Sequence, residues 1–174
     1  MTRLLAPLAA LAFSACGPIT FTTQLTGSGT VQGNPLGGLL NAFPTLSSFA
    51  SIDFNQNQDF KNNNAAKDKV KSVRVKSLTL QITAPNDQGF GFLDSVQFVA
   101  EANGQRAVFA SKSGIASLGL NPPNPTLTLE LADVDLASYV RADTVTLALE
   151  GSGRPPPKDT TLEAKVSLLV GVGL

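Results

Sequence analysis

The stretch TLEAKVSLLVGV, residues 161–172, alternates apolar and polar side chains along most of its length. Its apolar members share one face, namely Leu162, Ala164, Val166, Leu168, Val170 and Val172. The opposite face begins with Glu163, Lys165 and Ser167. Successive side chains of a β-strand point to opposite faces, so the pattern predicts a strand with one buried and one wet face. Such a strand is typical of an antiparallel sheet that packs through one side only.

Similar alternation recurs before this stretch, between turns rich in Gly, Pro and Asn. We expect further strands at 19–25 (extending to 31), 49–54, 67–83, 93–100, 106–111, 127–131 and 145–149. Two antiparallel sheets of this kind bury their apolar faces against each other. The sequence therefore predicts an all-β fold after an N-terminal signal helix: an antiparallel β-sandwich of about eight strands, with immunoglobulin-like architecture. A closed barrel is the alternative.

Two local patterns add detail to this expectation. In segment 67–83 the apolar positions change phase twice, from Val70 to Val73 and from Val75 to Leu78. Each change requires a bulge or a bend, and a strand that leaves one sheet for the other would show it. After residues 93–100, Asn103-Gly104 is a strong signal for a tight hairpin.

Two segments interrupt the alternation. Residues 33–48 are apolar but broken by Gly and Pro, and four large side chains follow helical spacing: Leu36, Leu39, Leu40 and Phe43. We expect an apolar loop or short helix that plugs one end of the sandwich, since apolar residues on one face usually belong to a core. The alternative is an exposed loop that touches lipid or a partner. Residues 55–64 are rich in Asn and predict an exposed loop.

The first sixteen residues have the composition of an export signal. Arg3 precedes the apolar run 4–13, and Ser14-Ala15 lead to Cys16, the only cysteine of the chain. The run is shorter than the ~20 residues of a membrane-spanning helix. With one cysteine, no disulfide forms within the chain.

Phe13-Ser14-Ala15-Cys16 resembles the lipobox of bacterial lipoprotein precursors, with Phe13 where Leu is usual. The resemblance implies that residues 1–15 are a signal peptide removed before Cys16, and that Cys16 carries a diacylglyceryl group. Two or more acyl chains make such an anchor stable. Because Gly17 rather than Asp follows, the resemblance favours the outer membrane as the location in the cell envelope. The alternative is an ordinary signal peptide with an incidental Cys16.

Residues 16–174 are expected to form a single domain. The C-terminal two thirds of the chain looks like small bacterial lipoprotein domains that share two segments, 92–96 (FLDSV) and 135–143 (DLASYVRAD). No activity is assigned to those domains, so the resemblance supports the fold only.

Composition limits the chemistry that is available. The chain has no His and a formal net charge of zero. Without histidine, Ser-His-Asp and Cys-His catalysis are impossible, and the commonest metal ligand is missing. Near-zero charge gives no attraction to nucleic acid. We therefore expect no enzyme activity and no cofactor.

Candidate metal ligands are few. Asp53, Asn55, Asn57 and Asp59 occupy every second position, as oxygen ligands of calcium loops do. The glycine and terminal Glu of an EF-hand are missing, so Asp53 and Asp59 are weak candidates and we expect no metal site. Asp133 and Asp135 are expected to cap the turn at Leu136 instead.

Two further groups have a functional and a structural interpretation. The basic run Lys67, Lys69, Lys71, Arg74 and Lys76 suits lipid phosphates, but lysines also protect an exposed strand from edge pairing, and we favour this second role. Phe90 and Phe92 suit a sugar-stacking platform, but loop phenylalanines more often cover a core.

These observations predict a membrane-anchored lipoprotein with a structural or protein-interaction role in the cell envelope. Its partners would be the membrane, through lipidated Cys16, and an envelope protein bound by loops or by an open strand edge. The alternative is a lipoprotein that binds a small ligand or carbohydrate. A hydrolase is third, because no sequence-close carboxylate pair marks a glycosidase site.

Overall fold

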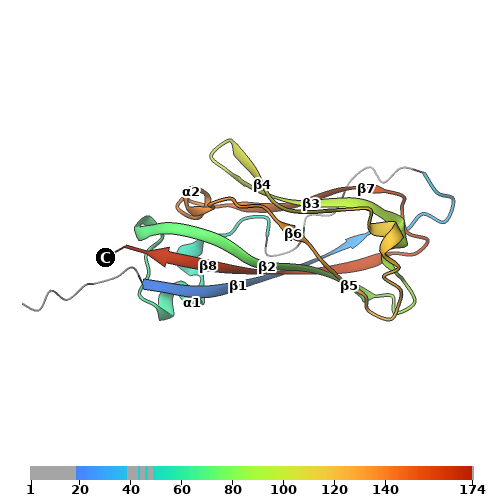
Figure 1. The fold of residues 1–174 in the computed structure, drawn as a ribbon, viewed down its shortest axis with the longest axis horizontal. Coiled ribbons are helices and arrows are strands. Elements are labelled where there is room, and N and C mark those ends of the chain that lie inside the picture. Colours follow the sequence, from blue (N-terminus) through green and yellow to red (C-terminus); the bar gives the residue numbers. More distant parts are fainter. Residues whose placement is uncertain (1–18, 39–42, 44–45, 47–48, 174) are drawn as a thin grey trace, which may run out of the picture.

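The computed structural model describes residues 19–38, 43, 46 and 49–173. They form two antiparallel sheets of four strands each, packed face to face (Figure 1). One sheet has the order β1-β8-β2-β5, with bounds Ile19–Val31, Thr160–Val172, Val70–Ala84 and Thr126–Thr128. The other has the order β6-β4-β3-β7, with bounds Glu130–Leu131, Gln105–Ser113, Leu93–Ala102 and Thr146–Gly153. The predicted sandwich of eight strands is confirmed.

β8, the strand predicted from residues 161–172, is central to the first sheet. It pairs with β1 on one side and β2 on the other, and its even-numbered side chains face the second sheet. Leu162, Ala164 and Val166 are each 0% exposed. An immunoglobulin domain keeps its last strand in the sheet of strands C and F. Here the last strand, β8, lies in the same sheet as β1 and β2. The chain therefore resembles an immunoglobulin domain in its two-sheet architecture and not in its strand order.

β2 contains the two predicted irregularities. Its pairing with β8 shifts register between Val70 and Ser72 and again between Val75 and Ser77. A third shift, between Ile82 and Ala84, was not predicted. The idea that this strand changes sheet is wrong, because β2 stays beside β8 along its whole length.

The change of sheet occurs at residues 126–131 instead. We predicted one strand here, but β5 pairs with β2 in the first sheet and β6 pairs with β4 in the second. Leu129 lies between them, and its N–H still donates to the Leu78 carbonyl at 3.1 Å. Alternation cannot reveal such a crossing, because the inward side chains stay apolar on both sides of it. Leu131 is 40% exposed at its end.

The hairpin between β3 and β4 is confirmed. Asn103 and Gly104 have φ angles of +52° and +73°, as a two-residue turn of type I′ requires. Further along, the helical turn expected near 136 is present as α2, Ala137–Val140.

Two expectations for residues 49–64 are wrong. No strand forms at 49–54, where only a single bridge joins Ile52 to Val145. The predicted loop at 55–64 instead contains a 3₁₀ turn, Phe54–Gln56, and the short helix α1, Gln58–Asn62. Phe60 explains the helix, because it is 0% exposed and its ring meets Phe21 of β1 edge-on at 5.2 Å. α1 thus closes the gap between the sheets beside β1.

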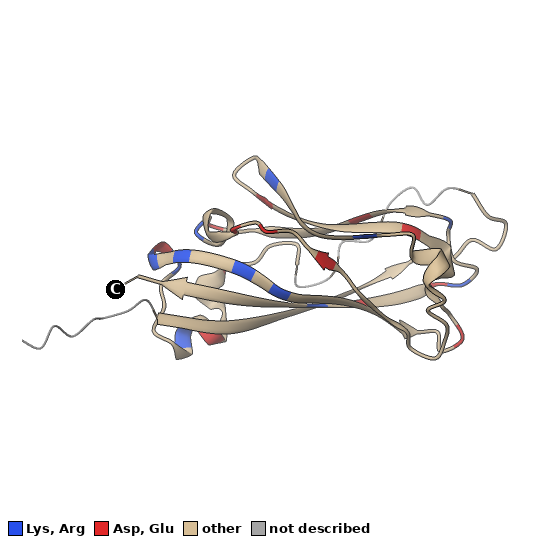
Figure 2. Cartoon of the chain, in the orientation of Figure 1, with Lys and Arg blue, Asp and Glu red and all other residues tan. Residues whose placement is uncertain are grey.

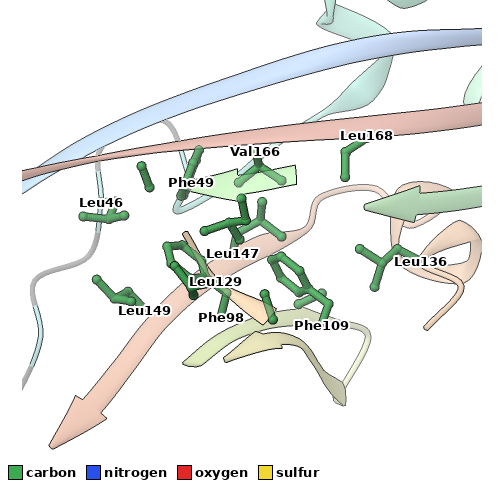
Figure 3. Close-up of a cluster of buried hydrophobic side chains, with 14 of the residues drawn as sticks. Leu46, Phe49, Phe98, Phe109, Leu129, Leu136, Leu147, Leu149, Val166 and Leu168 are labelled. Carbon is green, nitrogen blue, oxygen red and sulfur yellow. The ribbon is translucent and has the colours of Figure 1, made fainter. Parts of the chain in front are cut away.

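Aromatic and aliphatic side chains from both sheets fill the space between them, including Phe49, Phe98, Phe109, Leu147 and Leu168 (Figure 3). Segment 33–48 contributes in part. Leu46 is fully buried and Phe43 packs against the core, whereas Leu36 is 95% exposed. Leu39 and Leu40, on which the predicted short helix depends, lie outside the described residues.

Candidate interaction surface

The predicted lipid attachment residue, Cys16, lies outside the described residues. β1 begins at Ile19, three positions after it. No helix among residues 19–38 and 49–173 is long and apolar enough to cross a bilayer.

The weak calcium candidates have structural partners. Asp53 Oδ1 accepts the Asn55 N–H at 3.0 Å, and Asn57 Oδ1 accepts the N–H groups of Asp59 and Phe60 at 2.9 and 3.3 Å. These are the caps of the 3₁₀ turn and of α1. The described part of the chain holds no group of three or more Asp, Glu, His or Cys residues placed to bind a metal ion.

Asp135 has the capping role that we predicted, and a second one. Its Oδ1 accepts the N–H of Ala137 at 2.9 Å and that of Val73 in β2 at 2.9 Å. Asp133, for which we predicted the same capping role, instead forms an ion pair with Arg74 of β2. The two acids therefore fasten the segment that crosses between the sheets to β2.

The basic run follows β2 and the 3₁₀ turn Lys67–Lys69 before it (Figure 2). Lys67 has a structural role, because its Nζ donates to the carbonyls of Ala142 and Asp143 at 2.9 and 3.2 Å and its side chain is only 15% exposed. β5 pairs with residues 79–81 of β2 alone, so Lys71, Arg74 and Lys76 lie where β2 has no strand on that side. These side chains flank the hydrogen bonds that residues 135 and 136 make to Val73 rather than an open edge.

Phe90 and Phe92 form no surface platform. They are 0% and 7% exposed, in the 3₁₀ turn Phe90–Phe92, with their rings stacked at a centroid distance of 6.5 Å. The observation that had suggested sugar stacking is therefore explained by burial in the core.

A polar cluster on the outer face of the second sheet was not anticipated from the sequence. Arg106 forms ion pairs with Glu150 and with Glu101, and Gln97 Nε2 donates to Glu150 Oε2 at 2.7 Å. The hydrogen bond from Arg106, and then the one from Gln97, hold the pKa of Glu150 below its ordinary value of 4.5. A general acid needs a raised pKa, and the lowered pKa of Glu150 is the opposite of that property.

The edges of the two sheets differ in how they are covered. The N–H of Ile52 donates to Val145 O and that of Leu147 donates to Phe49 O, both at 2.8 Å, which covers the edge at β7. Asp135 and Leu136 bond to Val73, and Leu129 bonds to Leu78, which covers β2 beyond β5. β1 lies at the edge of its sheet, and β8 is its strand partner.

β1 also lacks the features that normally prevent edge pairing. Proteins protect exposed edges with charges, Pro or bulges. β1 has thirteen residues with no charge and no Pro, and its register with β8 runs from Ile19 to Val31 without a shift. Figure 2 shows the strand free of basic and acidic residues. We define the side of β1 that faces away from β8 as the open edge.

The outer face beside the open edge is polar but nearly uncharged. Side chains that point outward from β1 are Thr20, Thr22, Gln24, Thr26, Ser28 and Thr30. Their partners on β8 include Leu169, Ser167 and Thr161, and the only charged ones are Lys165 and Glu163, whose side chains pair with each other at 3.1 Å. A strand added next to β1 would therefore meet no unpaired charge from β1 or β8 on this face.

The open edge was not identified from the sequence, although a signal was present. Between Arg3 and Asp53 the chain has no charged residue. Strands inside a sheet are commonly uncharged. The absence of charge therefore indicates an interaction surface only when β1 is known to lie at an edge.

Comparison with known proteins does not assign a family. No family model matches the chain, and no curated protein matches it. Among solved structures, similarity is found to the decameric BFDV capsid protein, at 8% identity and TM-score 0.42, over 90% of this chain and 99% of that one. Desmodium yellow mottle tymovirus follows at 12% and 0.31, over 100% and 96%. Cocksfoot mottle virus follows at 11% and 0.30, over 100% and 97%.

Proposed function

We propose that the protein is a lipoprotein of the cell envelope, attached to the membrane, by preference the outer membrane, through a diacylglyceryl group on Cys16. Its role is to hold a partner protein there without catalysis. The partner would add an extended segment to the open edge of β1. One observation carries this proposal: an uncharged strand at the edge of its sheet, Ile19–Val31, begins three positions after the cysteine of the lipobox-like motif.

Strand addition is the recognition mode that suits this edge. A bound strand takes its affinity from backbone hydrogen bonds and its specificity from alternate side chains. In an antiparallel pair, about half of the residues of β1 direct their N–H and C=O groups away from β8. About six such residues offer roughly twelve hydrogen bonds, and the net ~1 kcal/mol of each is largely offset by the entropy of ordering the partner, so the affinity is modest. Membrane attachment strengthens such weak pairing, because it confines both proteins to one layer.

The lipid attachment is tested by metabolic labelling with palmitate and by fractionation of membranes. We expect the wild-type chain to take up label and to stay in the membrane fraction after washing with salt. The Cys16→Ala variant should lose both properties. Label that survives the substitution would refute attachment at Cys16.

The partner role is tested with a photo-crosslinking amino acid placed in living cells. Gln24 on β1 and Ser167 on β8 are direct cross-strand partners and point to the same outer face, so they form a matched pair. We expect one discrete adduct from position 24 and none from position 167, because only β1 lies at the edge. The band is then identified and reproduced with the two purified proteins.

Other outcomes would contradict the proposal. Adducts from both positions would mean that a partner binds the outer face of the sheet and not the open edge. No adduct from position 24, with lipid attachment intact, would remove strand addition and leave the lipoprotein assignment standing.

A further inference from the structure

We propose that the end of the sandwich at which β1 begins is a membrane-contacting surface that lies against the phosphates of an anionic lipid layer. This inference rests on the lipid attachment proposed above. We define the tether end by Ile19, Ala66, Lys69, Lys71 and Val172.

Strand register brings these residues together. Val172 pairs with Ile19 of β1 on one side and with Val70 of β2 on the other. The N–H of Gly173 donates to the Lys69 carbonyl at 3.0 Å. Lys69 and Lys71 flank Val70, so both lysines lie at the end where β1 begins. Figure 1 shows the start of β1, the start of β2 and the end of β8 at this same end.

The length of chain before β1 limits how far this end can be from a lipid anchor. Three Cα steps separate Cys16 from Ile19, and they span at most ~11 Å. A polar headgroup layer is about 5–8 Å thick on each side of a bilayer. Charges interact strongly within a Debye length of about 8 Å at physiological salt. A lipid on Cys16 therefore holds the tether end within reach of lipid phosphates.

The chemistry of the tether end suits that environment. Ile19 is 45% exposed, which is unusual for isoleucine in a sandwich but suited to the boundary between headgroups and acyl chains. Lys69 and Lys71 are exposed and form no ion pair with any described residue, and Asp68 is the single acid between Lys67 and Lys71. At the opposite end, by contrast, Lys158 pairs with Asp87.

A hollow opens on the tether end and combines both kinds of surface. It has a volume of about 330 Å³. Ile19, Val172 and Ala66 give it an apolar side, while Asn64 and Lys69 give it a polar one. An ammonium group beside apolar side chains is the arrangement that binds a lipid phosphate while the apolar part meets the acyl boundary.

The orientation is tested with tryptophan fluorescence, since the chain has no Trp of its own. Ala66→Trp places a reporter on the tether end, and Leu118→Trp places one in the 3₁₀ turn Ile115–Leu118 at the opposite end (Figure 1). The lipidated protein is reconstituted into vesicles of phosphatidylglycerol and brominated phosphatidylcholine. We expect position 66 to lose most of its fluorescence to the brominated chains and position 118 to keep it. Equal quenching at both positions, or at neither, would refute the proposed contact.

The role of the lysines is tested in the Ala66→Trp background. Replacing both Lys69 and Lys71 by Gln should lower the ratio of quenched to unquenched protein about 25-fold in vesicles rich in phosphatidylglycerol, at about fivefold per lysine. Lys158→Gln with Lys165→Gln is the matched control and should change nothing. An equal effect of the two pairs, or no effect of the first, would show that phosphate contact is not what orients the domain.

Failure of the lipid attachment can be told apart from failure of this inference. Intact mass reports whether Cys16 carries the acyl groups. If it does not, the thiol, which is the only one in the chain, can be coupled to a maleimide-bearing lipid and the same quenching measured. An unmodified mass refutes the attachment, whereas unselective quenching of the coupled protein refutes the contact surface.

Discussion

Replacing Leu168 by Ala should lower the free energy of unfolding by about 3–5 kcal/mol. Leu168 is 2% exposed on β8 and faces Leu147 and Phe109 of the second sheet and Leu136 of the segment before α2 (Figure 3). The substitution removes three carbons, worth about 2.4 kcal/mol at ~0.8 kcal/mol per buried methylene. The remainder comes from the cavity that is left.

The free-energy cost of the cavity should be large at this site. A small hollow of about 10 Å³ already borders Leu168, lined on the other side by Tyr139 and Val140 of α2. Both sheets and α2 are fixed by hydrogen bonds around it, so the walls have little freedom to collapse into the new space. At 2–4 °C per kcal/mol for a domain of this size, the melting temperature should fall by roughly 10 °C.

Leu169→Ala is the matched control, with the same chemical change one residue along the same strand. Leu169 points to the outer face and is 37% exposed. Urea denaturation of both variants measures the difference, and we expect Leu169→Ala to cost less than about 1 kcal/mol. Equal losses, or a larger loss at 169, would contradict the assignment of the even-numbered face of β8 to the core.

Three further substitutions test local features of the fold. Asn57→Ala removes the cap of α1 and should cost about 1 kcal/mol in urea denaturation, and an unchanged midpoint would mean that the cap is dispensable. Gly104→Ala forces a side chain into φ +73° and should cost roughly 1–2 kcal/mol, whereas Gly91→Ala, in open space without a positive φ, should be nearly neutral; the reverse order would refute the hairpin geometry. Because Arg106 lowers the folded pKa of Glu150 below 4.5, its contribution is present above that pH and is lost as the pH falls through the lowered value. Glu150→Gln should therefore lose less stability between pH 5 and pH 3 than the wild type, by a small amount because the site is exposed, and an identical pH profile would exclude the effect.

Alternation predicted the sandwich because most inward positions of the strands are apolar and most outward ones polar. The phase changes in β2 were equally informative, since Val73 and Leu78 must face the core and only a bulge permits it. Alternation did not show where the chain crosses between the sheets, because Leu127 in β5 and Leu129 at the crossing are both buried. The prediction of an exposed loop around Phe60 was wrong for a different reason. A single aromatic residue among asparagines indicates a loop, and its burial depends on Phe21, far away in the sequence.

The open edge was harder to predict from the sequence than the fold. Whether a strand lies at an edge depends on pairing between distant segments, and β1 is at an edge because β8, more than a hundred residues later, takes its other side. The basic run is visible in the sequence, yet only the register shows that Lys69 and Lys71 lie at the same end of the sheet as Ile19. The weak calcium candidates illustrate the opposite case, where regular spacing along the sequence was produced by two successive caps.

Hydrogen exchange of β1 tests the central claim most directly. The purified lipidated protein is compared with the same protein in native envelopes, and peptides that cover Ile19–Val31 and Thr160–Val172 are followed by mass spectrometry. About half of the amides of β1 point away from β8, so they should exchange fast in the purified protein and slowly in envelopes, while β8 stays protected in both. Exchange of β1 that is identical in the two preparations would contradict the account, because it would mean that nothing pairs with the open edge in the envelope.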